Sequence, residues 1–304
     1  MSIRKIIGKV RNIEEQRRLN DPFYASFSDK ANNLTTRLGK VDAMTSAAHI
    51  KRVHAVETAL DALWYKREET RYRVRRIEAL TRQITSRTYN RAVAAGTTGQ
   101  AGPKVRVSLL IDSDEVAFEV DAFFQAAMSA CDKIAKLAYS LLAAKEEAAI
   151  TRGLQHKSIH AFVTSARSRV TSPTFSKIMA AWDSWIHDLK DCRDFVEHHG
   201  RYFTYARNPD MNFPIMVPPP SWLEKLTRQQ INAFSLDELP MGNKELPVYC
   251  KRILEQLQQL VIGILDESSL KAKLRKQPGQ KKRADSRASG QSNVRQLPRT
   301  REAK

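Results

Sequence analysis

The 304-residue sequence has little of three residue types whose abundance marks particular protein classes: 11 glycines, 12 prolines and 3 cysteines. So few glycines and prolines exclude a low-complexity chain, and 42% hydrophobic residues are typical of a globular protein. The longest apolar stretch near the C-terminus, Leu260–Leu265, is far shorter than the roughly 20 residues that a membrane-spanning helix needs. The N-terminal residues lack the apolar run of a signal peptide, so we expect a cytoplasmic protein that does not enter a membrane.

The three cysteines are too few and too far apart for a disulfide framework. Cys131, Cys192 and Cys250 lie in helical patterns, which predicts buried, reduced thiols. No cysteine pair or Cys/His pair has zinc spacing. His156 and His160 are one helical turn apart, but no third ligand follows nearby. We therefore expect neither a metal ion nor a cofactor.

Positive charge is what the sequence has in excess. It holds 51 Lys and Arg residues against 33 Asp and Glu residues, a net charge of +18. Such a surplus favours contact with a polyanion, most often nucleic acid. The alternative is that the charge serves solubility alone.

Helical periodicity dominates the chain and predicts an all-α fold, an antiparallel bundle with a long N-terminal helical extension. The longest pattern, from about Ala47 to Ala95, would form a helix of roughly 70 Å, which should project or pair with a partner helix. The expected parts are a basic helical region (1–95), a linker with a short strand (96–111), a helical bundle (112–270) and a disordered basic tail (271–304).

The long helical pattern carries a row of arginines. Arg67, Arg71, Arg75 and Arg82 fall on one side, because steps of four and seven residues return to nearly the same angle. Such a ridge can follow a phosphate backbone. The alternative is a solvated helix face that nearby glutamates partly neutralise.

A helix that begins after Ser172-Pro173 and ends before Gly200 contains the best candidate site. Its apolar face is predicted to include Leu189 and Val196, and Arg193 falls on the same face. Burying a guanidinium is costly unless it is paired or borders a wet cleft. Arg193 therefore either fixes helix packing through Asp194 and Glu197 or lines a polar groove.

The segment from Arg193 and the polar Asp194 to His198, near the end of a bundle helix, resembles the HEPN family (higher eukaryotes and prokaryotes nucleotide-binding domain). The helix around 121–137 is similar in character to the preceding helix of that family, and the likeness covers roughly residues 112–270. It implies a homodimeric, metal-independent RNA endonuclease. Arg193 would clamp a phosphate, His198 or its rival His199 would be the acid/base, and Asp194 would orient one of them. The family also implies a toxin–antitoxin or abortive-infection role, with a neutralising antitoxin as partner.

Arg201 and Arg207 follow this helix among several aromatic residues. Such a segment can bind RNA by stacking on bases, or its rings can pack against the bundle. The function that competes with the ribonuclease belongs to another class: a non-catalytic nucleic-acid-binding or scaffold protein in which Arg193 is structural.

Overall fold

The structure described here is a computed structural model. It describes residues 20–40, 47–94, 108–110, 113–142, 158–167, 170–200, 202, 204–207, 214–221, 223–224 and 244–274.

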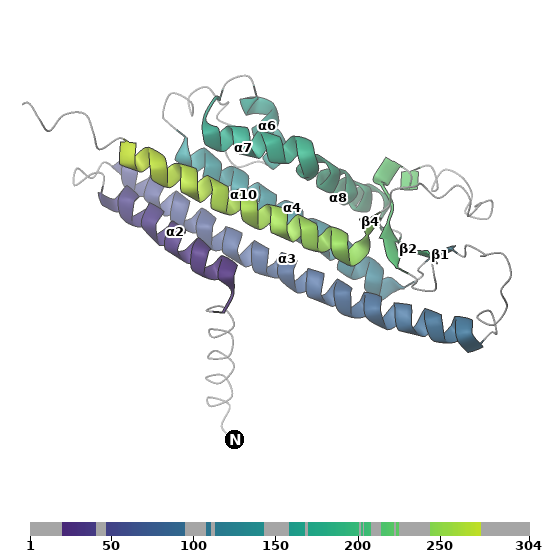
Figure 1. Cartoon of the computed structure of the whole chain (residues 1–304). Coiled ribbons are helices and arrows are strands. Elements are labelled where there is room, and N and C mark those ends of the chain that lie inside the picture. Colours follow the sequence, from purple (N-terminus) through teal and green to yellow (C-terminus); the bar gives the residue numbers. More distant parts are fainter. Residues whose placement is uncertain are drawn as a thin grey trace, which may run out of the picture.

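Helices dominate these residues, as the periodicity predicts (Figure 1). The elements are α2 (Pro22–Lys40), α3 (Ala47–Ala94), β1 (Ser108–Leu110), α4 (Asp114–Leu141), α6 (Ile159–Ala166), α7 (Pro173–Ala181), the π-helical turn η2 (Trp182–Ile186), α8 (His187–His199), β2 (Tyr205–Arg207), β3 (Ile215–Val217), β4 (Lys244–Glu245) and α10 (Leu246–Leu274). None of these helices is long and apolar enough to cross a bilayer.

The long helix α3 is continuous over 48 residues, which confirms its predicted length. It pairs with helices of its own chain and runs antiparallel to α4. Near its start, Arg52 Nε donates to the carbonyl oxygen of Ser140 at the end of α4 (2.8 Å). Further along α3, Arg73 contacts Glu119 near the start of α4 at 2.9 Å. The last turns of α3 extend past the rest of the described bundle (Figure 1).

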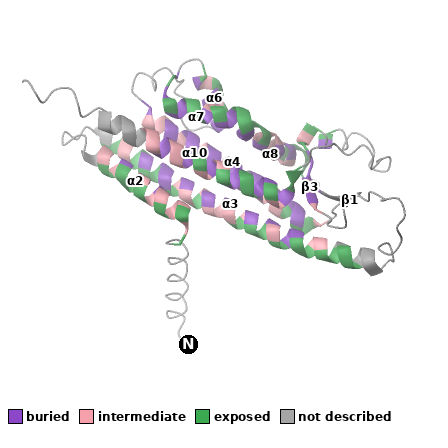
Figure 2. Ribbon diagram, viewed as in Figure 1, coloured by how far each residue is buried: buried purple, intermediate pink, exposed green. Residues whose placement is uncertain are grey.

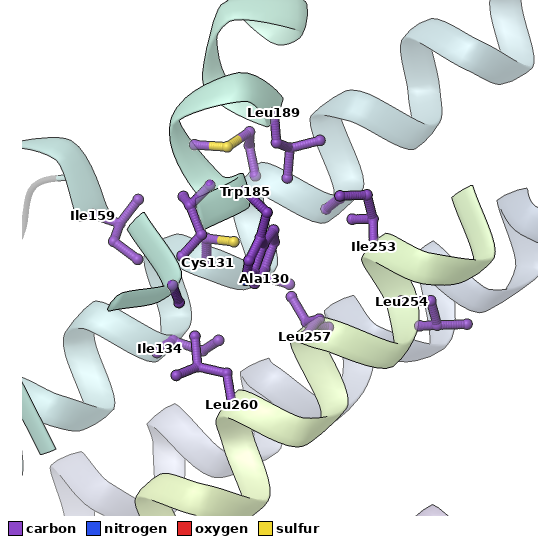
Figure 3. Packing of buried hydrophobic residues seen from close by; sticks show 14 of the residues in the cluster. Ala130, Cys131, Ile134, Ile159, Trp185, Leu189, Ile253, Leu254, Leu257 and Leu260 are labelled. Carbon is purple, nitrogen blue, oxygen red and sulfur yellow. The ribbon is translucent and has the colours of Figure 1, made fainter. Parts of the chain in front are cut away.

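The core is one connected cluster of buried side chains. Within it, α4, α6, η2, α8 and α10 meet around Cys131, Trp185 and Leu257 (Figure 3). The same cluster includes Val56 and Ile77 of α3, so apolar packing is continuous from the N-terminal helices into the later ones. All three cysteines are buried and reduced, as predicted.

A small antiparallel sheet lies at one end of the bundle, in the order β1-β2-β3-β4. Strand β1 confirms the strand predicted in the linker, and Leu109 pairs with Ala206. Strands β2 and β3, which follow α8, were not predicted. Strands of three residues complete too little of the two-residue alternation to be recognised in a sequence.

The helix end predicted before Gly200 is confirmed, and helix α2 begins at Pro22, directly after its cap Asp21. Gly200 ends α8 with a φ of +79°, a conformation that glycine adopts without strain. Residues 271–274, assigned to the tail, belong to α10. The rest of the tail and linker residues 96–107 lie outside the described residues.

The sequence did not predict η2, the π-helical turn between α7 and α8. A π turn bonds residue i to i+5, so the regular 3.6-residue projection cannot be carried across it. The buried positions of α8 are Leu189, Cys192 and Phe195, whereas the predicted face ran through Leu189, Arg193 and Val196. Placing Arg193 on the core-facing stripe was therefore wrong, and Arg193 lies half-buried beside it.

Candidate functional site

Arg67, expected on an exposed basic ridge, is instead buried, with 3% of its surface exposed. Its Nη1 atom donates to Asp21 Oδ2 at 2.7 Å and also to Glu68 Oε1. Its guanidinium lies 4.5 Å from the ring centre of Phe23 and 5.5 Å from that of Trp64. A guanidinium enclosed by rings and paired with carboxylates is not available to a phosphate.

Arg67 also reaches α10. The side-chain amide of Gln258 faces the guanidinium of Arg67. With the amide oriented so that its oxygen points to Arg67, this oxygen accepts from Nη2 at 2.5 Å and from Nε at 2.9 Å. Arg67 thus joins the start of α2, the middle of α3 and the face of α10. Its role is structural, as buried arginines with complete hydrogen bonding usually are.

Asp21 is the carboxylate that completes this cluster. Its Oδ1 accepts from the backbone N–H of Phe23 at 3.0 Å and caps α2, while its Oδ2 faces Arg67 and Arg71. Burial alone would raise the pKa of Asp21. The hydrogen bond and charge of Arg67, with the backbone hydrogen bond and Arg71, outweigh burial and lower this pKa.

Arg71 is intermediate between buried and exposed. It pairs with Asp21 and with Glu68 Oε2 at 3.3 Å, and 18% of its side chain is exposed. Burial lowers its pKa, and the charges of Arg67 and Arg75 act in the same direction. Beside it lies an open hollow of about 650 Å³, lined by Asn20, Asp21, Pro22, Arg67, Arg71 and Arg75.

Beyond α2, the basic character of α3 is exposed. Between residues 73 and 91 the sequence holds six arginines and one acidic residue, Glu78. Two of these arginines share Glu119 of α4: Arg73 at 2.9 Å and Arg76 at 3.3 Å. Glu78 itself pairs with Lys251 of α10 at 2.6 Å. The local carboxylates are therefore already occupied.

Arg75 and Arg82 remain exposed, and neither has a carboxylate partner among the described residues. Ser86 and Tyr89 are exposed on the same side. At 3.6 residues per turn these four positions lie within about 60° of the helix circumference. We call Arg75, Arg82, Ser86 and Tyr89 the outer face of α3, and exposed residues predominate in this part of the helix (Figure 2).

The sequence interpretation missed the exposed tyrosines of α3. Tyr65, Tyr72 and Tyr89 are 67%, 55% and 45% exposed, and they are half of the six large, exposed hydrophobic residues found in the described part of the chain. Tyr72 lies at about 60° from Arg75 around the helix, on the flank of the outer face. The sequence does contain a signal for them, because these tyrosines lie on a polar, charged helix face. Exposed rings near arginines are typical of surfaces that bind single-stranded nucleic acid.

The end of α8 brings Arg193 close to carboxylates. Its Nη2 contacts Asp194 Oδ1 at 2.8 Å, its Nη1 contacts Glu197 Oε1 at 3.0 Å, and its Nε is buried with no partner in the described structure. Asp194 also pairs with Lys190. Burial would raise the pKa of Asp194, but Lys190 and then Arg193 outweigh burial and lower it.

The charge of Arg193 also acts on a third carboxylate, Asp132 of α4. Asp132 accepts from the backbone N–H of Ile159 at 2.8 Å and thereby holds the start of α6. Burial raises the pKa of Asp132, and this hydrogen bond and Arg193 only partly offset the effect. Arg193 is thus largely neutralised by its surroundings, which is the arrangement expected of a structural arginine.

The histidines at the end of α8 are exposed. The ring of His199 stacks on Phe195, with centroids 4.4 Å apart. His198, five residues after Arg193, lies about 140° from it around the helix, so one copy of the helix does not aim both side chains at one point.

The remaining predicted residues are only partly described. Arg201 and His156 lie outside the described residues, and of Arg207 only the backbone is described, paired with Ser108. His160 stacks on Trp182, with centroids 5.4 Å apart. In the described part of the chain, no three His, Cys, Asp or Glu side chains gather as a metal site would require.

Comparisons with known proteins identify no relative. No protein-family model matches the chain, and neither the curated proteins nor the solved structures give a significant match.

Proposed function

We propose that this protein binds single-stranded nucleic acid along the outer face of α3. The observation that carries the proposal is the pair of exposed arginines, Arg75 and Arg82, that have no carboxylate partner in the described structure. They are seven residues apart, or about 10 Å along the helix. Cations so spaced on one face suit successive contacts with a phosphate backbone.

The neighbouring tyrosines favour a single strand over a duplex. Tyr89 continues the outer face and Tyr72 flanks it, and both rings are about half exposed. Bases of a single strand are free to stack on such rings, whereas bases of a duplex are already stacked on one another. The hollow beside Arg71 and Arg75 extends the basic surface toward the start of α2.

The test is fluorescence anisotropy with short, unstructured RNA and DNA strands and with the matching duplex. We expect the affinity to fall steeply as salt is raised from about 50 to 200 mM, because bound phosphates release counterions. The double variant Arg75→Glu/Arg82→Glu should weaken binding of a single strand at least about tenfold. Arg75→Ala/Arg82→Ala should lower the slope of log affinity against log salt by about 1.4, or about 0.7 for each lost phosphate contact.

A matched control reverses two charges elsewhere. Arg167 and Lys177 are exposed, lie on other helices and have carboxylate partners of their own. Arg167→Glu/Lys177→Glu changes the net charge by the same amount as the α3 variant. If both double variants lose affinity equally, general charge and not the outer face of α3 is responsible, and the proposal fails.

The resemblance to the HEPN family supplies a second candidate, a metal-independent ribonuclease that acts as a homodimer. It is favoured by the exposure of His198 and His199 at the same helix end as Arg193, whose Nε lacks a partner. Within one copy of α8, His198 lies about 140° around the helix from Arg193. The second copy of α8 in a dimer would therefore have to supply the histidine that acts beside Arg193. The histidine would transfer protons and the guanidinium would stabilise charge on the phosphoryl oxygens.

Purified protein should then cleave RNA without a metal ion and in the presence of a chelator. Arg193→Ala and His198→Ala should each abolish cleavage, and His199→Ala would show which histidine transfers the proton. Arg193→Ala should also leave RNA binding intact. Equal cleavage by the wild type and the first two variants would reject the ribonuclease and leave the binding proposal untouched.

A further inference from the structure

A small pocket lies between the π turn η2, the start of α8 and the first turns of α10, far along the chain from the outer face of α3. Its volume is about 120 Å³, and it is lined by Ser184, Trp185, Asp188, Lys244, Tyr249, Arg252, Ile253 and Gln256. That is room for about four water molecules at roughly 30 Å³ each. Sites for drug-sized ligands measure about 300–1,000 Å³, so this pocket suits a ligand of a few heavy atoms.

Two cations converge on this pocket. Lys244 Nζ lies 5.4 Å from the ring centre of Tyr249, and the guanidinium carbon of Arg252 lies 5.9 Å from the same ring. Neither forms an ion pair with a described residue, in contrast to the adjacent Lys251, which pairs with Glu78. Two like charges beside one ring repel each other, and an anion between them would relieve that repulsion.

The pocket also holds acceptors that lack donors. Gln256 lines it, and its Oε1 is buried with no hydrogen-bond partner among the described residues. Leaving such an atom unpaired in the folded protein is unfavourable. Asp188, the only carboxylate in the lining, has no ion pair with a described residue. A ligand that donates hydrogen bonds would satisfy both groups.

The π turn places two of the lining residues. Ser184 and Trp185 belong to η2, and Trp185 is buried. Single π turns in α-helices are rare and occur often at functional sites. The Oγ of Ser184 donates to the carbonyl oxygen of Ala181 at 3.3 Å, so its lone pairs remain available to a ligand.

We propose that this pocket binds a small zwitterion, an α-amino acid. Lys244 and Arg252 hold its carboxylate, and Asp188 and the Oε1 of Gln256 accept hydrogen bonds from its ammonium group. The ligand thereby pairs both cations with an anion and both acceptors with a donor. This proposal does not depend on the binding of nucleic acid by α3.

The test is isothermal titration calorimetry of the full-length protein with glycine, L-alanine and L-serine as probes. Acetate and methylammonium supply each half of the zwitterion alone, and inorganic phosphate tests for a general anion site. We expect at least one amino acid to bind about tenfold or more tightly than either half-probe. If acetate or phosphate binds as tightly as the amino acids, or if no probe binds, the proposal is overturned.

Matched variants locate the binding. Arg252→Gln and Asp188→Asn should each weaken binding of the amino acid at least about tenfold, and Arg252→Lys should restore part of it. The controls Lys251→Gln and Asp183→Asn change neighbouring charges outside the pocket lining and should leave binding unchanged.

Gln256→Leu separates binding from folding. It removes the buried acceptor that has no partner, so the melting temperature should hold or rise while binding is lost. Unchanged amino-acid binding by this variant would overturn the assignment of Gln256.

Discussion

Two sections of α3 carry arginines on nearly the same side and use them differently. In the section next to α2, Arg67 and Arg71 meet two carboxylates, Asp21 and Glu68, and Arg67 is buried. In the section beyond α2, Arg75 and Arg82 are exposed. We call these the covered section and the open section.

The difference arises outside α3. Helix α2 begins at Asp21, opposite Arg67 and Arg71, and its first aromatic ring, Phe23, covers the guanidinium of Arg67. No described element supplies an equivalent carboxylate opposite Arg82. The role of each arginine therefore depends on which segment ends or begins across from it, and position along the helix alone does not decide it.

The largest expected effect is on stability, in the covered section. Asp21→Ala should lower the free energy of unfolding by about 3 kcal/mol, because it removes one of the two carboxylates that pair with the buried charge of Arg67 and also removes the cap of α2. Urea denaturation followed by circular dichroism measures this. Asp21→Asn keeps a side chain that can cap α2, so it should lower the free energy of unfolding by less than Asp21→Ala does. The difference between the two variants separates the contribution of the cap from that of the charge.

Arg75→Ala is the counterpart in the open section. It should change the free energy of unfolding by less than about 0.5 kcal/mol, as surface substitutions usually do. A loss as large as that of Asp21→Ala would mean that the open section is also structural, and the contrast between the sections would collapse.

A smaller effect, on binding, is expected from the tyrosines of the open section. Tyr89→Ala should weaken binding of a single-stranded oligonucleotide by about 1 kcal/mol, or roughly fivefold, since one stacked base is lost. Its salt slope should match that of the wild type, because no phosphate contact changes. Tyr89→Phe keeps the ring and should bind normally; a loss there would indicate a hydrogen bond in place of stacking.

The smallest effect is the pH dependence of the covered section. The pKa of Asp21 is lowered in the folded protein from its ordinary value near 3.8. The charged carboxylate therefore stabilises the fold above that ordinary value, and the stabilisation is lost as pH falls toward the lowered pKa. The difference in unfolding free energy between wild type and Asp21→Asn should shrink below about pH 4. A difference that stays constant down to pH 2 would show that the charge of Asp21 is unimportant.

The sequence was informative wherever local rules decide the structure. The length of α3 and the stop at Gly200 follow from periodicity and capping, which act within a few residues.

Features that depend on distant partners could not be predicted. The burial of Arg67 requires knowing that Asp21, 46 residues earlier, lies opposite. The projection that placed Arg193 on the core face assumed a regular helix, and no local rule signals the π turn that precedes α8. The pocket at Arg252 joins α8 to α10 and therefore appears only after the helices are packed.

The π turn has an evolutionary consequence. A turn with i to i+5 bonds holds one residue more than an α-helical turn, so deletion of one codon within η2 would leave a regular α-helix. The wall of the pocket that carries Ser184 and Trp185 can thus be gained or lost in one mutational step, while the helices on either side persist. Among related chains, the presence of that one residue would separate those that keep the pocket from those that lack it.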